Sequence, residues 1–244
     1  MRNIALQCFA FWTILNQNAI CMMVWDISSE ASTYMASSES TTMDGRKEYA
    51  YDGNPDTCYR SDGNNGDLQT GYTFIYSSNY FIHGVVITTS HLGLGYILHD
   101  FVIDVFDSVY NRITCYREYG QVPEANSTLL YLCEHNSSTM PLIMTSIILK
   151  NQPNTGILTL CEVEVLGRSG FMGVFCRVEG YTLNGTSYST SSIRTKTSCS
   201  ILCEESNCKV YSVVVQDGGL MCNLYNENKF ILDKSSDSDF YFRC

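Results

Sequence analysis

Oxygen-bearing side chains are concentrated in one short segment, "AYDGNPDTC", which begins at Ala50. Asp52, Asn54 and Thr57 offer carboxylate, amide and hydroxyl oxygens, and Gly53 permits a sharp bend between the first two. A hard cation such as Ca²⁺ takes about six to eight oxygen ligands of these kinds. The same composition is also typical of an Asx-Gly surface turn that binds no metal. The segment therefore leaves two alternatives open, a calcium loop or a plain turn.

Three of the four histidines recur at every eighth residue, as His83, His91 and His99. None has a nucleophile at a recognisable spacing, and the chain contains no G-x-S-x-G, H-E-x-x-H or P-loop motif. We interpret these histidines as polar residues of loops or strand edges, with a ligand site as the alternative. The sequence thus predicts that the protein is not an enzyme.

The charge balance excludes another class of function. The net charge is −10, only 16% of the residues are charged, and no basic cluster is present. Nucleic-acid binding requires a basic surface, and an acidic chain is repelled by phosphate-rich and anionic-lipid surfaces. We therefore expect no nucleic-acid partner.

The N-terminus has the pattern of a secretory signal peptide. A short positive segment, "MRN", precedes the apolar run "IALQCFAFWTIL", which is too short to span a bilayer. A buried helix is the alternative reading of this run. Cleavage can follow Ala19 or Cys21. We prefer Cys21, and hence a signal peptide at 1–21, because this cleavage leaves an even number of cysteines.

Three N-glycosylation sequons agree with secretion, at Asn126, Asn136 and Asn184. Cysteine-rich chains behind a signal peptide belong to oxidising, extracellular compartments. No stretch after the signal is apolar enough to cross a membrane. We expect a secreted, extracellular glycoprotein without a membrane span.

The first part of the mature chain predicts short β-strands and no long helix. Apolar and aromatic runs are separated by Gly, Pro, Asn and Ser clusters, in the order "YTFIY", "YFIHGVVITTS", "FVIDVFD", "ITCYREY", "LLYLCE", "SIILK" and "LTLCEVEVLG". In the last run Glu162 and Glu164 alternate with Val163 and Val165, so that each pair occupies one face. This pattern is typical of a β-sandwich or a β-barrel.

The second part carries more cysteines per residue, as expected of a small domain whose core alone is insufficient. Its best helix candidate is "TSCSILCEESN", residues 197–207, with Thr197 or Ser198 as the N-cap. Cys199 and Cys203 are four residues apart and would share one face of the helix. "KVYSVVVQ" and "FYFRC" read as strands. The polar, glycine-containing stretch 166–171 is the expected boundary between the two parts.

Two of these motifs resemble one known family. "AYDGNPDTC" resembles a loop, and "LTLCEVEVLG" the closing strand, of F-type lectins (fucolectins) within the discoidin or coagulation factor type C superfamily. The resemblance covers roughly residues 25–167. It implies an all-β, jelly-roll-like sandwich of the discoidin or galactose-binding type.

The resemblance also implies disulfides and a calcium site. Carried over, the family's pairing gives Cys58–Cys161, with Cys115–Cys133 as the second bridge. F-type lectins hold a structural calcium ion between the two motifs. The corresponding ligands here are the side chains of Asp52, Asn54 and Glu162, the hydroxyl of Thr57, and the carbonyls of Tyr49 and Cys161. The loop from Asp52 to Cys58 is several residues shorter than is usual in the family.

The sugar-binding residues of the family are not reproduced. Arg60 stands where the family has a histidine, "SHLGLGYILH" lacks the two expected arginines, and the paired tryptophans near "TGYTFIY" are missing. The resemblance implies that Arg60 and His91 lie near one rim of loops, with Tyr59 and Tyr96 as aromatic neighbours. Such a rim could bind a glycan by stacking and hydrogen bonding.

The second part, residues 171–244, resembles a PAN/apple domain, a small disulfide-rich α+β fold. The family pattern places C-x3-C on a helix between flanking cysteines, and this chain has a cysteine at each corresponding position. Carried over, the bridges are Cys176–Cys244, Cys199–Cys222 and Cys203–Cys208. PAN domains bind proteins or carbohydrates.

Two functions follow from these resemblances. The first is lectin-like recognition of extracellular glycans or glycoproteins through a calcium-supported discoidin-type domain, with the PAN domain as an interaction module. The alternative is a protein–protein adhesion or extracellular-matrix module that has lost sugar binding. The missing histidine and arginines favour the alternative, whereas the Asp-Gly-Asn and Cys-Glu motifs favour the lectin.

Overall fold

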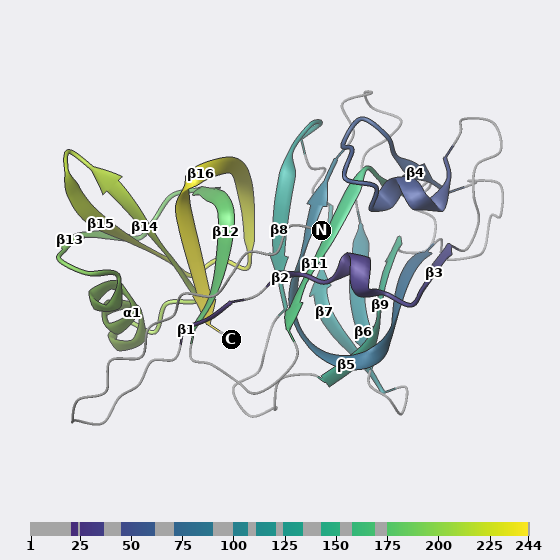
Figure 1. Cartoon of the computed structure of the whole chain (residues 1–244), viewed down its shortest axis with the longest axis horizontal. Coiled ribbons are helices and arrows are strands. Elements are labelled where there is room, and N and C mark those ends of the chain that lie inside the picture. Colours follow the sequence, from purple (N-terminus) through teal and green to yellow (C-terminus); the bar gives the residue numbers. More distant parts are fainter. Residues whose placement is uncertain are drawn as a thin grey trace.

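The computed structural model of the chain consists mainly of β-strands (Figure 1). It describes residues 21–23, 25–36, 45–61, 71–89, 100–106, 111–120, 124–133, 143–151, 158–168 and 175–243. The strands of the first half are β1 (Cys21–Met23), β2 (Trp25–Asp26), β3 (Thr33–Ala36), β4 (Tyr59–Arg60), β5 (Gly71–Thr88), β6 (Phe101–Phe106), β7 (Arg112–Arg117), β8 (Thr128–Leu132), β9 (Ile143–Asn151), β10 (Thr159–Leu160) and β11 (Glu162–Arg168). Those of the second half are β12 (Phe175–Asn184), β13 (Ser189–Ile193), β14 (Val210–Gln216), β15 (Gly219–Tyr225) and β16 (Lys229–Arg243).

Strand β5 is long, bent and shared between two layers. The sequence predicts two strands here, "YTFIY" and "YFIHGVVITTS", and the structure joins them into one. The first arm pairs with β3 and β9, and the second pairs with β11 and β8, with a break in register between Ile75 and Tyr80. Ser77 and Ser78 at the break are exposed, so the bend occurs where no core contact opposes it. In Figure 1, the bend of β5 is the curved ribbon at the lower end of this half.

The two layers pack face to face around an aromatic core, so the first half is a β-sandwich. One layer contains β3, the first arm of β5, β9, β6 and β7, and the other contains β2, β11, the second arm of β5 and β8. Tyr72, Phe74 and Tyr131 are fully buried between them. Val163 and Val165 also face this core, while Glu162 and Glu164 are half-buried on the opposite face, which confirms the alternation predicted for β11.

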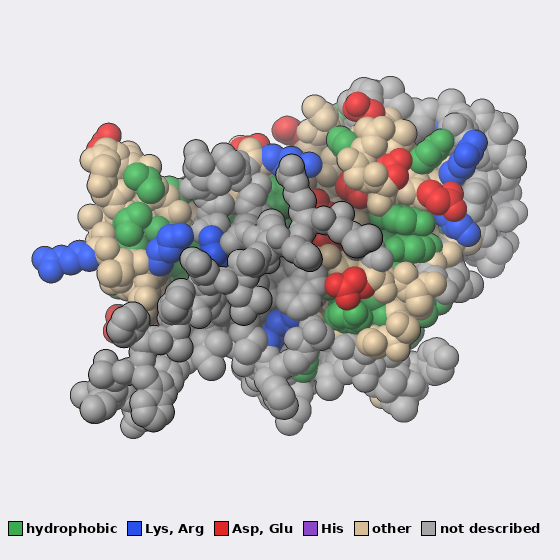
Figure 2. Space-filling model, viewed as in Figure 1, with side chains coloured by type: hydrophobic (Ala, Val, Ile, Leu, Met, Phe, Trp, Pro, Cys, Tyr) green, Lys and Arg blue, Asp and Glu red, His purple; other side chains and the backbone are tan. Residues whose placement is uncertain are grey.

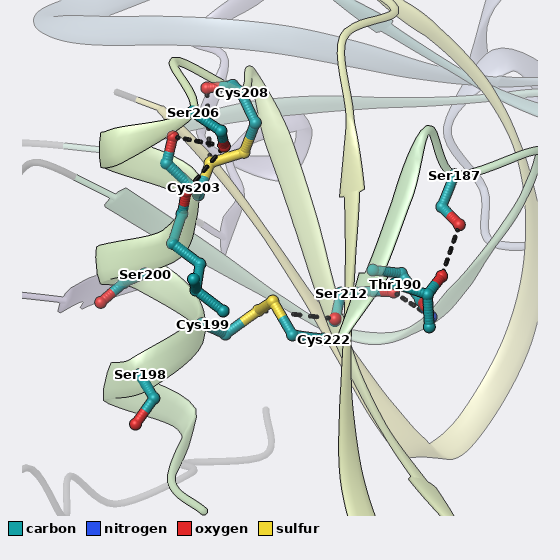
Figure 3. Close-up of a disulfide and its surroundings, with 12 residues drawn as sticks. Ser187, Thr190, Ser198, Cys199, Ser200, Cys203, Ser206, Cys208, Ser212 and Cys222 are labelled. Carbon is teal, nitrogen blue, oxygen red and sulfur yellow. Dashed lines mark hydrogen bonds between the residues drawn. A yellow bond between two sulfur atoms is a disulfide. The ribbon is translucent and has the colours of Figure 1, made fainter. Parts of the chain in front are cut away.

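The second half contains the only α-helix of the described residues, α1 (Lys196–Glu205). The helix begins one residue before the predicted stretch 197–207 and ends at Glu205, and its N-cap is Thr195 rather than Thr197 or Ser198. The hydroxyl of Thr195 accepts a hydrogen bond from the backbone N–H of Ser198 at 3.2 Å. Cys199 and Cys203 both point from one face of α1 into the core beneath it, as predicted (Figure 3).

The two halves share a hydrogen-bonded sheet and a hydrophobic core. Residues 229–232 of β16 pair with 128–131 of β8, and β1 pairs in parallel with β12. The outer face of the β8–β5–β11 layer presents Val86, Leu130 and Leu166 to a cluster from the second half that includes Phe230 and Phe242. The strands "GVVIT" and "TLLYL" are continuous apolar runs because both of their faces are buried.

The expected boundary at 166–171 falls partly inside a strand. Leu166, Gly167 and Arg168 are the last residues of β11, and all three are buried. Gly167 packs closely there, because an added Cβ atom would lie 2.5 Å from the terminal carbon of the buried Ile27 side chain and 3.2 Å from the carbonyl oxygen of Phe81. The division into a 25–167 and a 171–244 domain stays a prediction.

Within the part of the chain that the structure describes, no helix combines the length and the apolar character that crossing a membrane requires.

Candidate functional site

The segment that begins at Ala50 lies at one end of the sandwich. Its partner, Glu162, is the first residue of β11 and pairs with Thr88 at the end of β5. Thr88 in turn pairs with Thr128, the first residue of β8. We call this end of the sandwich the loop end, because the chain leaves β5 and enters β8 and β11 here.

Buried neighbours fix the entry into the loop. A 3₁₀-helix, η2 (Lys47–Ala50), precedes it, and Ala50 at its end is fully buried in the sandwich core. The hydroxyl of Tyr72 donates to the carbonyl of Lys47 at 2.8 Å. Tyr51 stacks on Tyr34, with ring centroids 3.9 Å apart. The loop therefore begins from a rigid platform.

Side-chain oxygens organise the loop itself. Asp52 accepts hydrogen bonds from the backbone N–H of Asn54 at 2.9 Å and from the hydroxyl of Thr57 at 2.6 Å. The amide oxygen of Asn54 accepts from the N–H of Asp56 at 3.1 Å. Gly53 has a φ of 77°, in the left-handed region that glycine adopts without strain. These are the contacts of consecutive Asx turns.

Two contacts hold the loop against β11. Cys58 and Cys161 form a disulfide across a sequence separation of 103 residues. The backbone N–H of Gly53 donates to Oε2 of Glu162 at 2.8 Å. Beside them, β4 and β10 pair through Tyr59 and Leu160. We refer to the disulfide and the Gly53–Glu162 hydrogen bond together as the latch.

The carboxyl of Glu162 has an unusual electrostatic environment. Partial burial raises its pKa to about 7, and the nearby carboxylate of Asp52 contributes in the same direction, whereas the Gly53 hydrogen bond opposes the shift. Two like charges that approach each other in a partly desolvated site disfavour ionisation. A bound cation would remove this repulsion.

The donor set fits a hard cation in its chemistry. No three His, Cys, Asp or Glu residues of the described segments are arranged as a metal centre. A calcium ion at this place would therefore need amide, hydroxyl and backbone oxygens besides the carboxylates of Asp52 and Glu162. Asn54, Thr57 and the peptide groups of the loop are donors of these types.

One residue that we predicted for the sugar-binding rim is buried in the structure. Tyr59 is fully buried, and its ring contacts that of Tyr72 at a centroid distance of 5.1 Å. It cannot stack on a ligand at the surface, so this prediction was wrong. Arg60 is half-buried beside the loop. Gly45 packs against it so closely that a Cβ atom added to Gly45 would lie 2.8 Å from the Cβ atom of Arg60. His91 and Tyr96 lie outside the described residues.

His83 also differs from its interpretation as a loop or strand-edge residue. It lies in the second arm of β5, between β8 and β11, and is only 1% exposed. Its Nε2 accepts a hydrogen bond from Nε of Arg168 at 3.2 Å, and its ring lies 5.6 Å from that of Phe242. The residue belongs to the core between the two halves. His99 lies outside the described residues.

Three more of the expected disulfides are formed. Cys115–Cys133 links β7 to the residue after β8. Cys199–Cys222 attaches α1 to β15, and Cys203–Cys208 closes the turn after the helix (Figure 3). Cys176 lies in β12, and its expected partner Cys244 is outside the described residues.

Two of the three sequons lie at exposed positions. Asn126 is exposed in a turn, with a φ of 58°, and Asn184 is exposed at the end of β12. Asn136 is outside the described residues.

One exposed pair at this sandwich was not anticipated from the sequence. Arg117 ends β7, and Tyr119 follows it with 62% of its side chain exposed. Nη1 of Arg117 donates to the hydroxyl of Tyr119 at 2.8 Å. The segment "ITCYREYG" carries no motif that distinguishes these two residues from other strand-end residues.

Comparisons of sequence found no relatives. No protein-family model matches the chain, and no curated protein matches it either.

Comparison of folds found discoidin-like domains. The family 32 carbohydrate-binding module of C. perfringens NanJ, solved with galactose, is 19% identical over 59% of this chain and 99% of its own, with a TM-score of 0.46. An F5/8 type C domain from Bacteroides fragilis is 14% identical and covers 59% and 95%, with a TM-score of 0.47. A fucose-binding module from Streptococcus pneumoniae is 17% identical and covers 59% and 95%, with a TM-score of 0.47. Likeness at this level says nothing about what this chain binds.

Proposed function

We propose that this chain is a non-enzymatic extracellular binding protein that recognises glycans at the loop end of its sandwich. The sandwich provides a rigid scaffold, a calcium ion supports the loop end, and the cysteine-rich second half is a PAN/apple-type interaction module. Glycoproteins or free glycans are the partners.

The latch is the observation that carries this proposal. The two motifs that resemble F-type lectins are more than a hundred residues apart in sequence, and the Cys58–Cys161 disulfide and the Gly53–Glu162 hydrogen bond join them. A loop held at both ends loses little conformational entropy when it binds a ligand. Binding residues are often placed on loops that a rigid scaffold positions.

Calcium would be held between Asp52, Asn54 and Glu162, with the Thr57 hydroxyl and the carbonyls of Tyr49 and Cys161 as further donors. Bound there, the ion supplies positive charge and fixes the loop against β11. The hydrogen bond from the N–H of Gly53 to Oε2 of Glu162 supports this assignment, because it places the Asp52 loop against the Glu162 carboxyl. Calcium is proposed as a structural element rather than a direct sugar ligand.

The second half supports the proposal through its cysteines. Cys199–Cys222 and Cys203–Cys208 are two of the three bridges that the PAN/apple resemblance implies. Their formation and that of the sandwich disulfides accord with an oxidising compartment. Disulfides of this kind hold a small sheet and a helix together without a large core.

One observation favours a protein–protein adhesion module as a second candidate. Tyr59 is buried, and Arg60 replaces the family histidine, so two of the anticipated rim positions do not provide the usual sugar contacts. The loop end would then contact a protein surface.

A glycan array probed with the full chain, in calcium and in chelator, tests the proposal. The full chain is needed because the fragment 25–167 would expose the apolar face that the second half covers. Retention of glycans that weakens in chelator supports lectin function. If the folded protein retains no glycan in either buffer, the lectin proposal fails and the adhesion module stands.

A further inference from the structure

Tyr119 is an exposed aromatic ring held in one orientation. Its side chain is 62% exposed, although a tyrosine of this size gains stability from burial. Its hydroxyl accepts from Nη1 of Arg117 at 2.8 Å, and the guanidinium carbon lies 5.7 Å from the ring centroid. The ring is therefore fixed at its hydroxyl edge and keeps apolar surface in contact with water.

The backbone around Tyr119 is anchored on both sides. The N–H of Glu118 donates to the carbonyl of Phe101 at 2.9 Å, and the N–H of Gly120 donates to the carboxylate of Asp100 at 2.6 Å. Glu118, between the two exposed residues, points inward and forms an ion pair with Lys229 at 2.6 Å. A rigid aromatic residue of this kind can bind a ligand without a large entropic cost.

Strand pairing places this pair at the loop end. Arg117 of β7 pairs with Val102 of β6, and Val102 pairs with Lys150 of β9. Lys150 in turn pairs with Gly71, which is the first residue of β5. The start of the first arm, Gly71, and the end of the second arm, Thr88, both belong to β5, and Thr88 pairs with Glu162. Both arms of β5 run from one bend to this end (Figure 1).

We propose that Arg117 and Tyr119 form a sugar-binding subsite for a neutral hexopyranose. The C–H face of the pyranose ring would stack on Tyr119, and its hydroxyls would accept hydrogen bonds from the guanidinium of Arg117. This inference rests on the proposed glycan-binding function and names residues for it that differ from Arg60, His91, Tyr59 and Tyr96.

Charge favours a neutral sugar over an acidic one. The chain carries a net charge of −10, and the carboxylate of Asp100 lies next to the pair, where it accepts a hydrogen bond from the N–H of Gly120. Figure 2 shows further acidic side chains over the first half, on the face that it draws. This field repels a carboxylated or sulfated glycan at low ionic strength. The single guanidinium of Arg117 can orient hydroxyl groups without requiring a ligand charge.

Four variants of the full chain test the subsite on immobilised asialofetuin, a glycoprotein whose chains end in neutral sugars, and on an array of neutral oligosaccharides. Tyr119→Ala should weaken binding about tenfold, and Arg117→Gln about fivefold. Tyr119→Phe keeps the ring and should lose less than Tyr119→Ala. Tyr188→Ala removes a tyrosine that is 49% exposed on the second half and should leave binding unchanged.

Each outcome decides one question. Near-ultraviolet circular dichroism and thermal melts establish that each variant is folded. If the wild-type chain binds neutral glycans and Tyr119→Ala binds them equally well, the subsite is wrong while the lectin function stands. If all four variants lose binding equally, the subsite is also wrong. If the wild-type chain binds no glycan, the proposed function and this inference fail together.

Discussion

Lys229 in the second half forms an ion pair with Glu118 in the first, with its Nζ atom 2.6 Å from Oε2 of Glu118. The Glu118 side chain is 6% exposed and that of Lys229 is 23% exposed. Near this contact, the N–H of Leu132 donates to the carbonyl of Asn228 at 2.8 Å. Tyr181 donates its hydroxyl to Glu164 at 2.5 Å on the same boundary. The two halves are thus joined by specific polar contacts as well as by apolar packing.

Replacing Lys229 by Met should destabilise the chain by about 2–4 kcal/mol, because the Glu118 carboxylate would stay buried without this ion pair. Adding Glu118→Gln to this variant should restore much of the loss. Urea unfolding of the two single variants and the double variant measures the coupling. Additive losses would contradict a direct interaction between the two side chains.

The shared core should make the chain unfold as one unit. Leu130 is fully buried against side chains of the second half, so Leu130→Ala should cost about 2–5 kcal/mol. The matched control is Val215→Ala, at a side chain that is 72% exposed, and it should change stability by less than about 0.5 kcal/mol. Calorimetry of the wild-type chain should show a single transition. Two separate transitions would show that the halves fold independently.

Removing the disulfide of the latch should affect stability and the loop together. Cys58 and Cys161 close a loop across 103 residues, so their replacement by serine should cost about 4–5 kcal/mol in the chain-entropy model. It should also increase amide hydrogen exchange at Gly53, whose N–H is bonded to Glu162. The double replacement at Cys203 and Cys208, which are 5 residues apart, is the control and should leave exchange at Gly53 unchanged.

The pH dependence of stability in chelator should report on Glu162. Its pKa in the folded chain is about 7, above its ordinary value of 4.5, so the folded state holds a proton that the unfolded state releases. The stability that this group contributes is present at low pH and is lost as the pH rises from about 4.5 to about 7. Glu162→Gln should therefore lose less thermal stability than the wild-type chain between pH 5 and pH 7.5. Equal pH profiles would contradict the raised pKa.

The strand pattern of the first half was predictable because local alternation and turn residues determine it. Val163 and Val165 face the core as expected. The Cys58–Cys161 pair is also formed, but it was implied by the family resemblance and not by the local pattern. The bend that turns two predicted strands into β5 was not predictable, since it depends on β9 and β11 pairing with different arms. Periodicity over a few residues contains no information on such distant partners.

The candidate site was only partly predictable for a similar reason. The loop from Asp52 to Thr57 could be located from its composition. The burial of Tyr59 and His83 could not, because it results from neighbouring strands and, for His83, from Phe242 in the other half. Tyr119 has no distinctive motif, and its exposure is apparent only in the folded chain.

The most direct test of calcium-supported glycan recognition is a glycan array probed with the folded full chain at pH 7.5, in millimolar calcium and in excess chelator. Thermal melts in the same buffers measure calcium binding independently, since a ligand at 100 times its Kd stabilises the folded state by about 2.7 kcal/mol. We expect retention of neutral glycans and a higher melting temperature in calcium, with Glu162→Gln losing the calcium-dependent part of both. Unchanged melting in chelator, together with an empty array, would contradict the account.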